Sequence, residues 1–125
     1  MLSQLAEQRK VDWKPAIVFA TAYLEKAGID NLKKEFEGRK ASLRGCLENL
    51  SLNEVAFFLY GLKIVNEKYF TWMTQVWKER IKVVHQKGEL HAYVGDEANK
   101  KYCGMIKRAL EVLKFLKTQG AEENK

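Results

Sequence analysis

The chain has 125 residues, of which 46% are hydrophobic and 30% charged, and its formal net charge is +6. This is the size of one ordinary domain, and the composition excludes a disordered or collagen-like chain. One proline in the whole sequence favours helices over a sheet. We therefore predict an all-α fold, a single compact bundle of about five helices over residues 1–120, followed by a frayed tail at residues 121–125.

The N-terminal residues lack the charged-then-apolar order of a signal peptide, and the longest apolar run, Val55 to Leu62, is too short to span a bilayer. Cys46 and Cys103 form no metal-binding or disulfide motif. Two reduced thiols are the first interpretation, and a bridge between them is the alternative for an unusual compartment or a hyperthermophile. We expect a cytoplasmic protein with no membrane partner.

The first helix is predicted to begin after Ser3 and to end near Ala27, with Gly28 as its stop. Pro15 either kinks this helix or lies in the first turn of a new helix capped by Asp12. The residues expected to face inward are Ile17, Ala20, Tyr23, Leu24 and Ala27.

A second helix is predicted from Asp30 or Asn31 to Glu48, with a bend near Gly38 or Gly45. The residues expected to face inward are Leu32, Phe36, Leu43 and Leu47.

The clearest helix start lies at Ser51, which forms a capping box with Glu54, while Leu50 and Val55 form a hydrophobic staple. A helix is therefore predicted to begin at Leu52. Because it is apolar on nearly all sides, we predict that it is the central, buried helix. Truncation of a fully buried Phe58 to alanine would then cost about 3–5 kcal/mol.

A fourth helix is predicted to end near Lys87 and Gly88, before a loop over residues 88–95 that holds His91 and Tyr93. Its apolar stripe is Tyr69, Trp72, Met73, Val76, Trp77, Ile81 and Val84.

The segment from Asp96, the predicted cap, to Gly120 is the most informative one, because it predicts an amphipathic helix with an apolar stripe and a basic face. The stripe is Tyr102, Met105, Ile106, Ala109, Leu110, Leu113 and Leu116. The basic face, our candidate nucleic-acid-binding site, is Lys100, Lys101, Lys107, Arg108, Lys114 and Lys117, interrupted only by Glu111.

Further cations lie on the second predicted helix (Lys33, Lys34, Arg39, Lys40, Arg44) and the fourth (Lys78, Arg80, Lys82, Lys87). Acidic residues dilute the former cluster, which favours a solvated face there. An RNA bound to the last helix would be held mainly through its backbone, with salt-dependent affinity and little sequence preference.

No residue pattern predicts catalysis, a resident metal or a cofactor. His85 and His91, with Asp96, Glu97 or Cys103, lack the spacing of a metal-binding helix motif. A Cys103–histidine nucleophile is less favoured than a packed thiol. For Trp72 and Trp77, core packing is favoured over base stacking, and Trp13 is left open.

Three groups of residues resemble a known family. They are Gln8-Arg9-Lys10 before Ala16-Ile17-Val18-Phe19-Ala20; Lys40-Ala41-Ser42-Leu43, then Asn49 and Ala56-Phe57-Phe58-Leu59; and Tyr102 before Ala109-Leu110-Glu111-Val112-Leu113-Lys114-Phe115-Leu116-Lys117. Their order and spacing are similar to those of the small helical subunit of the type III-B CRISPR effector, the Cmr complex. The chain departs from the family at Leu50, where glycine is frequent, at Phe115, where tryptophan is frequent, and at Thr118, where a basic residue is frequent.

The resemblance implies a non-catalytic subunit for antiviral defence that contacts the backbone subunits of an effector complex and helps to hold target RNA. It implies that the basic face of the last helix contacts RNA or another subunit. The alternatives are a protein-interaction bundle that binds an acidic partner and a stand-alone nucleic-acid-binding module. An enzyme is the least favoured class, because no polar constellation converges in the sequence.

Overall fold

The structure is a computed structural model that describes residues 11–37, 45–85 and 93–123. Its helices are α2 (Lys14–Glu35), α4 (Leu52–Gly61), α5 (Glu67–His85) and α6 (Asp96–Glu123), and a short helical segment covers residues 45–47. The described residues contain no β-strand. The predicted all-α bundle is confirmed.

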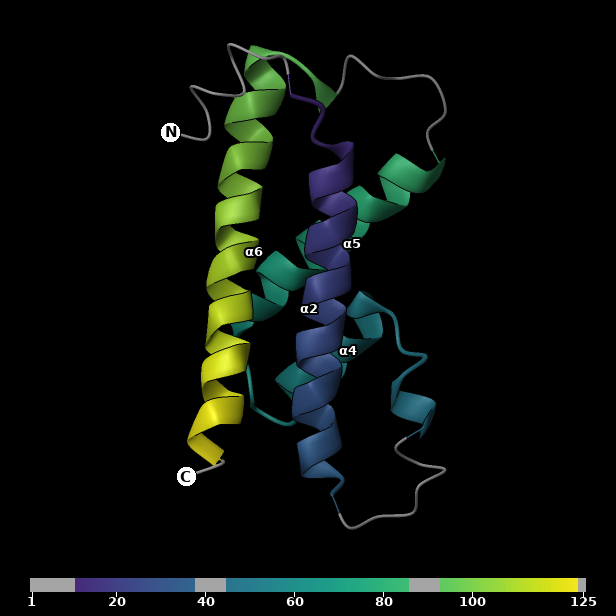
Figure 1. Ribbon diagram of the computed structural model, residues 1–125, viewed down its shortest axis with the longest axis vertical. Coiled ribbons are helices and arrows are strands. Elements are labelled where there is room, and N and C mark those ends of the chain that lie inside the picture. The colour runs from purple at the N-terminus through teal and green to yellow at the C-terminus, as the bar shows by residue number, and fades with distance from the viewer. Residues whose placement is uncertain (1–10, 38–44, 86–92, 124–125) are drawn as a thin grey trace.

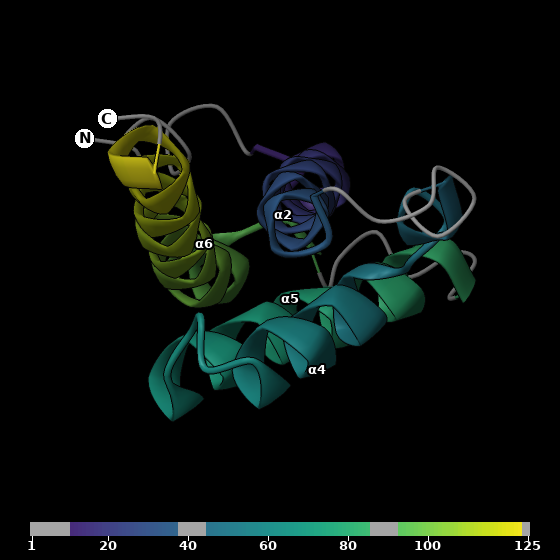
Figure 2. The ribbon, with the colours of Figure 1, turned by 90° about the horizontal axis from the view of Figure 1, so that it is seen from below.

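The helices form two layers. α2 and α6 lie side by side and both begin at the same end of the molecule, so they run parallel (Figure 1). α4 and α5 form a hairpin that packs across them as the second layer (Figure 2). Among the described helices, α5 contacts the other three, and so does the longer α2, which we call the central helix. Its fully buried Ile17, Leu24 and Leu32 form one side of the core.

The start of α2 decides between the two interpretations of Pro15. The N-cap is Trp13, and the predicted cap at Asp12 is wrong. The Asp12 side chain, one residue before the cap, accepts a hydrogen bond from the Lys14 backbone N–H at 3.0 Å. Pro15 lies in the first turn, as one interpretation predicted. Proline fits there because the first turn of a helix has no internal partner for its N–H groups. The predicted cap at Ser3 lies outside the described residues.

The predicted break at Gly28 is wrong, because α2 continues through it to Glu35. Gly28 is buried where α2 meets α4, and a Cβ built on it would clash with the Val55 side chain and lie 3.3 Å from Leu59. The missing side chain therefore permits a close approach of the two helices instead of ending one of them.

The predicted helix start at Asp30 or Asn31 is wrong for a related reason. The buried amide of Asn31 donates to the Ala27 carbonyl at 2.9 Å, within α2, and to the Leu116 carbonyl of α6 at 3.1 Å. Its hydrogen-bonding capacity is used to join two helices and not to cap one. The second predicted helix is thus divided between the end of α2 and residues 45–47, and Gly38 and Leu43 lie outside the described ranges.

The capping box that starts α4 is confirmed. Ser51 Oγ accepts from the Glu54 backbone N–H at 3.3 Å, and the Glu54 carboxylate accepts from the Ser51 N–H at 3.0 Å, which lowers the pKa of Glu54. Glu25 of α2 accepts from the Leu52 N–H at 2.8 Å. This bond ties the first turn of α4 to the central helix.

The prediction that this helix is the central one is wrong. α4 ends at Gly61 and buries only one face, with Val55 and Leu59 inward, whereas Phe57 and Phe58 are 57% and 49% exposed. A sequence that is apolar on all sides is typical of a core helix, but among the described helices α4 packs mainly against α2 and α5. The estimate of about 3–5 kcal/mol for Phe58→Ala does not apply to a ring with this exposure.

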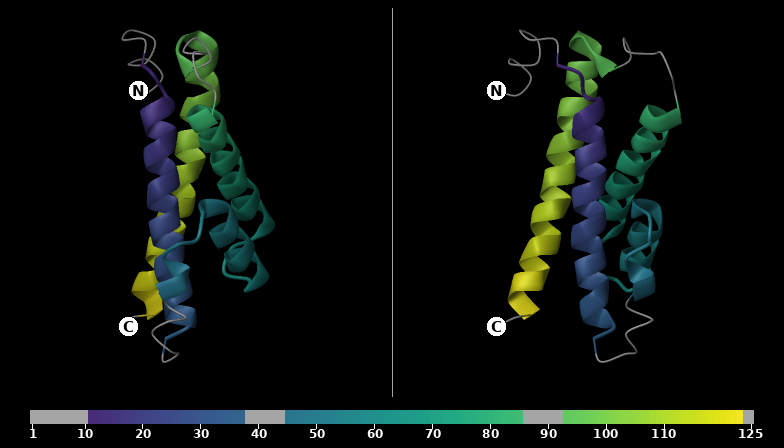
Figure 3. Two further views of the ribbon diagram at one scale, coloured as in Figure 1. Left: turned by 90° about the vertical axis from the view of Figure 1, so that its right-hand side faces the viewer. Right: turned by 45° about the vertical axis from the view of Figure 1, so that its right-hand side comes forward.

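Several residues of the other predicted stripes are exposed. Tyr23 of α2, Ile81 and Val84 of α5, and Leu110 of α6 are between 37% and 58% exposed. The right-hand view of Figure 3 shows the C-terminal end of α5 diverging from α2 and α6.

We predict that Gly28→Ala lowers the free energy of unfolding by about 1–3 kcal/mol, because the added methyl group overpacks the contact with Val55. Urea denaturation measures the change. Gly61→Ala is the matched control, since a Cβ there meets no atom within 4 Å. Equal stability of the two variants would contradict the close approach.

Candidate nucleic-acid interface

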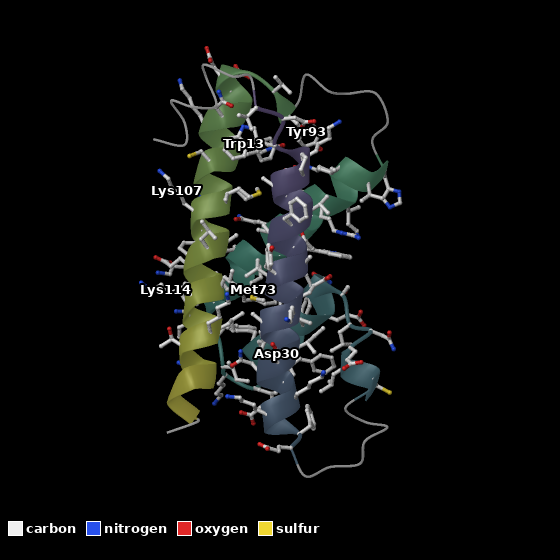
Figure 4. All side chains as sticks on the ribbon, in the orientation of Figure 1. Trp13, Asp30, Met73, Tyr93, Lys107 and Lys114 are labelled. Atoms are coloured by element: carbon white, nitrogen blue, oxygen red, sulfur yellow. The ribbon has the colours of Figure 1, made fainter. Side chains whose placement is uncertain are left out.

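The six cations predicted as a basic face all lie on α6. Lys100, Lys101, Lys107, Lys114 and Lys117 are exposed, and Arg108 is half-buried. Figure 4 shows Lys107 and Lys114 pointing away from the other helices. The opposite side of α6 is packed into the core through Ala98, Tyr102, Met105, Ala109, Val112 and Leu116. The division of α6 into an apolar and a basic side is therefore present, with Leu110 on the outer side.

Lys101 and Arg108 differ in environment from the other four cations. Lys101 lies 3.2 Å from the Glu79 carboxylate of α5 and 5.1 Å from the centre of the Tyr102 ring. The Arg108 guanidinium lies back along α6, over Gly104. These two side chains border the contact with α5, so the outward-facing strip consists of Lys100, Lys107, Lys114 and Lys117. We call this set the lysine strip.

Within the described residues, none of the four lysines of the lysine strip forms an ion pair. Glu111, which interrupts the basic face in sequence, interacts with Tyr69 of α5: together with burial, its charge and hydrogen bond raise the pKa of that phenol. Glu111 is nevertheless exposed, so one carboxylate lies among the lysines on this side of α6.

A shallow surface depression lies beside the lysine strip. It is lined by Leu110, Leu113, Lys114, Lys117 and Thr118. Leu110 is 53% exposed, so this part of the basic side also presents apolar surface. The predicted stripe had assigned Leu110 to the core, and its placement on the outer side is the one feature of this face that the sequence did not indicate.

Sequence analysis also missed Glu79, which is only 6% exposed. Its carboxylate accepts a hydrogen bond from the Tyr102 hydroxyl at 3.1 Å and lies 3.2 Å and 3.7 Å from the ammonium groups of Lys101 and Lys82. A buried carboxylate is tolerated because these partners replace water. Its position three residues after buried Val76 was the signal available in the sequence.

The three tryptophans pack within the protein. Trp13 is buried and its indole N–H donates to the Asn99 side chain at 2.9 Å, which settles the open interpretation in favour of packing. Trp72 and Trp77, for which core packing is predicted, pack against the core but are only half-buried. Cationic groups of Lys68 and Arg80 lie 5.1 Å and 5.5 Å from their ring centres.

The remaining cationic clusters are less accessible to a ligand or only partly described. Lys33 forms an ion pair with Glu48 at 2.6 Å, consistent with a solvated, mixed face on that side. Lys78 and Lys82 of α5 are exposed. Arg39, Lys40, Arg44 and Lys87 lie outside the described residues.

Neither cysteine is in a disulfide, and Cys103 is buried while Cys46 is exposed, so the predicted packed thiol at Cys103 is confirmed. Among residues 11–37, 45–85 and 93–123, no group of three or more His, Cys, Asp or Glu residues could hold a metal ion. His91 lies outside these residue ranges. No helix in these ranges is long and apolar enough to cross a membrane.

Exposed aromatic side chains form a second kind of unpartnered surface. Phe19 and Tyr23 lie one turn apart on α2 and are 62% and 58% exposed. On α4, Phe57 and Tyr60 pack against Phe70 of α5, with ring centres 5.0 Å and 4.8 Å apart, and both remain partly open to solvent. Exposed aromatic clusters of this kind are frequent in protein–protein contacts.

Comparison with known proteins adds no relative. No protein-family model matches the chain, and neither does any curated protein or solved structure.

We predict an alkaline loss of stability that depends on Tyr102. Burial, and then the charge of Glu79, raise the pKa of this phenol above its usual value. The unfolded chain releases the proton near pH ~10 whereas the folded chain holds it, so the contribution of Tyr102 is complete below about pH 10 and falls above it. Tyr102→Phe should lower the free energy of unfolding by about 1.5–3 kcal/mol near neutral pH, the value of a hydrogen bond to a charged group.

The difference between wild type and Tyr102→Phe should then shrink in urea titrations above about pH 10. Tyr23→Phe is the control, because that side chain is 58% exposed. A difference that stays constant across this pH range would contradict the buried hydrogen bond between Tyr102 and Glu79.

Proposed function

We propose that this chain is a non-catalytic small subunit of an RNA-targeting ribonucleoprotein complex in the cytoplasm, of the CRISPR effector class that its sequence motifs resemble. The observation that carries the proposal is the lysine strip: four exposed lysines on one side of α6, opposite the core, with no ion pair among the described residues. A surface of this kind favours a polyanion, and contacts to its phosphates give affinity without sequence preference.

The exposed aromatics of α2 and α4 support the assembly part of the proposal. Phe19, Tyr23, Phe57 and Phe58 are each at least 49% exposed, on helices that do not carry the lysine strip. A subunit within a larger complex needs a surface for protein and another for RNA, and these surfaces are separate here. The same aromatics favour the second candidate function, a protein-interaction bundle whose basic side meets an acidic protein.

A stand-alone DNA-binding module fits less well. The helix that would enter a major groove should present polar side chains to base edges. α4 is the short helix in position to do so, and its exposed face carries Phe57, Phe58 and Tyr60. An enzyme also fits less well, because the buried carboxylate of Glu79 is fully engaged with Tyr102, Lys101 and Lys82.

The proposal is tested by affinity capture of the tagged full chain from its source cells, with and without RNase treatment, followed by mass spectrometry and sequencing of bound RNA. We expect several larger protein subunits together with a short guide-like RNA. Capture of one acidic protein, insensitive to RNase, would instead support the protein-interaction bundle.

We predict that Lys107→Glu with Arg108→Glu weakens RNA binding without unfolding the protein. Loss of the Lys107 phosphate contact should reduce the slope of log affinity against log salt by about 0.7 for single-stranded RNA, and the reversed charge at Arg108 adds repulsion beside it. The matched control is Lys26→Glu with Lys78→Glu, two exposed lysines on other helices with the same change in net charge. Equal affinity of the two double variants at low salt would exclude the basic side of α6 as the RNA contact.

A further inference from the structure

We infer that α6 binds single-stranded RNA lengthwise, with phosphates on Lys100, Lys107 and Lys114 and an unpaired base over Leu110. This inference rests on the proposed RNA contact. It adds that the RNA is single-stranded, that the strand runs along the helix axis and that one base is bound at a subsite. The observations that carry it are the spacing of the three lysines and the exposure of Leu110 between them.

The three lysines recur every seven residues along α6. Seven residues of an α-helix advance about 10.5 Å, and three nucleotides of a stacked strand advance about 10.2 Å. The lysines therefore meet every third phosphate of a strand that runs parallel to the helix axis. Because a seven-residue repeat drifts by only about 20° around the helix, all three charges stay on one side.

Leu110 lies between Lys107 and Lys114 along the helix and is 53% exposed. With Leu113 and the stems of Lys114 and Lys117 it lines the shallow depression described above. Apolar surface between two phosphate-binding groups favours the ring of an unpaired base, which a single strand presents and a duplex hides. The site therefore discriminates by strandedness and not by sequence.

Glu111 is the one acidic residue between Lys107 and Lys114, and it is exposed. Glu111 interacts with Tyr69, on the side of α6 that contacts α5. Lys101 is likewise held by Glu79 at 3.2 Å. The path of the strand therefore follows the outer side of α6, away from the contact with α5.

Fluorescence anisotropy with the full chain tests this inference. The probes are labelled oligouridylates of about four, eight and twelve nucleotides, a duplex of similar length and inorganic polyphosphate. The lysines 100 to 114 span about 21 Å, or roughly six to seven nucleotides. We expect the eight- and twelve-nucleotide strands to bind alike, the four-nucleotide strand to bind at least about tenfold more weakly, and the salt slope to be about −2, for three phosphates.

Two pairs of variants separate the phosphate and base contacts. Lys107→Gln with Lys114→Gln should reduce the salt slope by about 1.4, and Lys26→Gln with Lys78→Gln should leave it unchanged. Leu110→Ser should weaken oligouridylate binding severalfold and leave polyphosphate binding unchanged. Val84→Ser is its control, with 51% exposure at the far end of α5.

The outcomes distinguish this inference from the proposed function. Absence of any oligonucleotide binding at low salt would remove the RNA contact itself. Equal affinity for duplex and single-stranded RNA would overturn the lengthwise single-strand site. So would a Leu110→Ser variant that loses as much affinity for polyphosphate as for oligouridylate. Either result would leave a basic RNA contact in place.

Discussion

The bundle depends on α2 remaining helical through Gly28 and Asn31. Two residues that usually interrupt helices are used here for contacts: Gly28 lets α4 approach closely, and Asn31 donates to the Leu116 carbonyl of α6. If α2 ended at Gly28, the C-terminal half of α6 would lose its contact with Asn31 and keep its contact with α5, where Tyr69 packs against Phe115. α4 would lose part of the surface that buries Val55 and Leu59. One uninterrupted helix thus organises both layers.

α4, α5 and α6 all pack against α2, and α2, α4 and α6 each leave one side uncovered. α6 turns its lysine strip outward, α4 turns Phe57 and Phe58 outward, and α2 itself exposes Phe19 and Tyr23. The uncovered sides differ in chemistry, one cationic and two aromatic. A small protein with separate surfaces of these two kinds is suited to hold an anionic strand while attached to other proteins.

The sequence predicted those features that depend on neighbouring residues. The capping box at Ser51 and the amphipathic α6 follow from local hydrogen bonding and helical periodicity, and both were predicted correctly. The features set by tertiary contacts were missed: the course of α2 through Gly28, the exposure of Phe58 and the burial of Glu79. The local conformational preference of glycine is the same whether it ends a helix or lets a neighbouring helix approach closely. Only the presence of the neighbouring helix decides which of these roles the glycine has. The candidate site was predictable in its charges but not in the position of Leu110.

The parallel pairing of α2 and α6 also bears on how the chain acquires its structure. The hydrogen bonds from Trp13 to Asn99 and from Asn31 to Leu116 join residues 86 and 85 positions apart. Contacts between distant residues require closure of a long loop before they contribute, so folding is slower than in a bundle whose paired helices are neighbours in sequence. During synthesis, α2 emerges early but meets α6 only when the last helix has left the ribosome. The side of α2 that packs against α6 stays uncovered until then, although α4 and α5 are made earlier and can cover the rest, and an uncovered apolar surface makes the nascent chain vulnerable to aggregation.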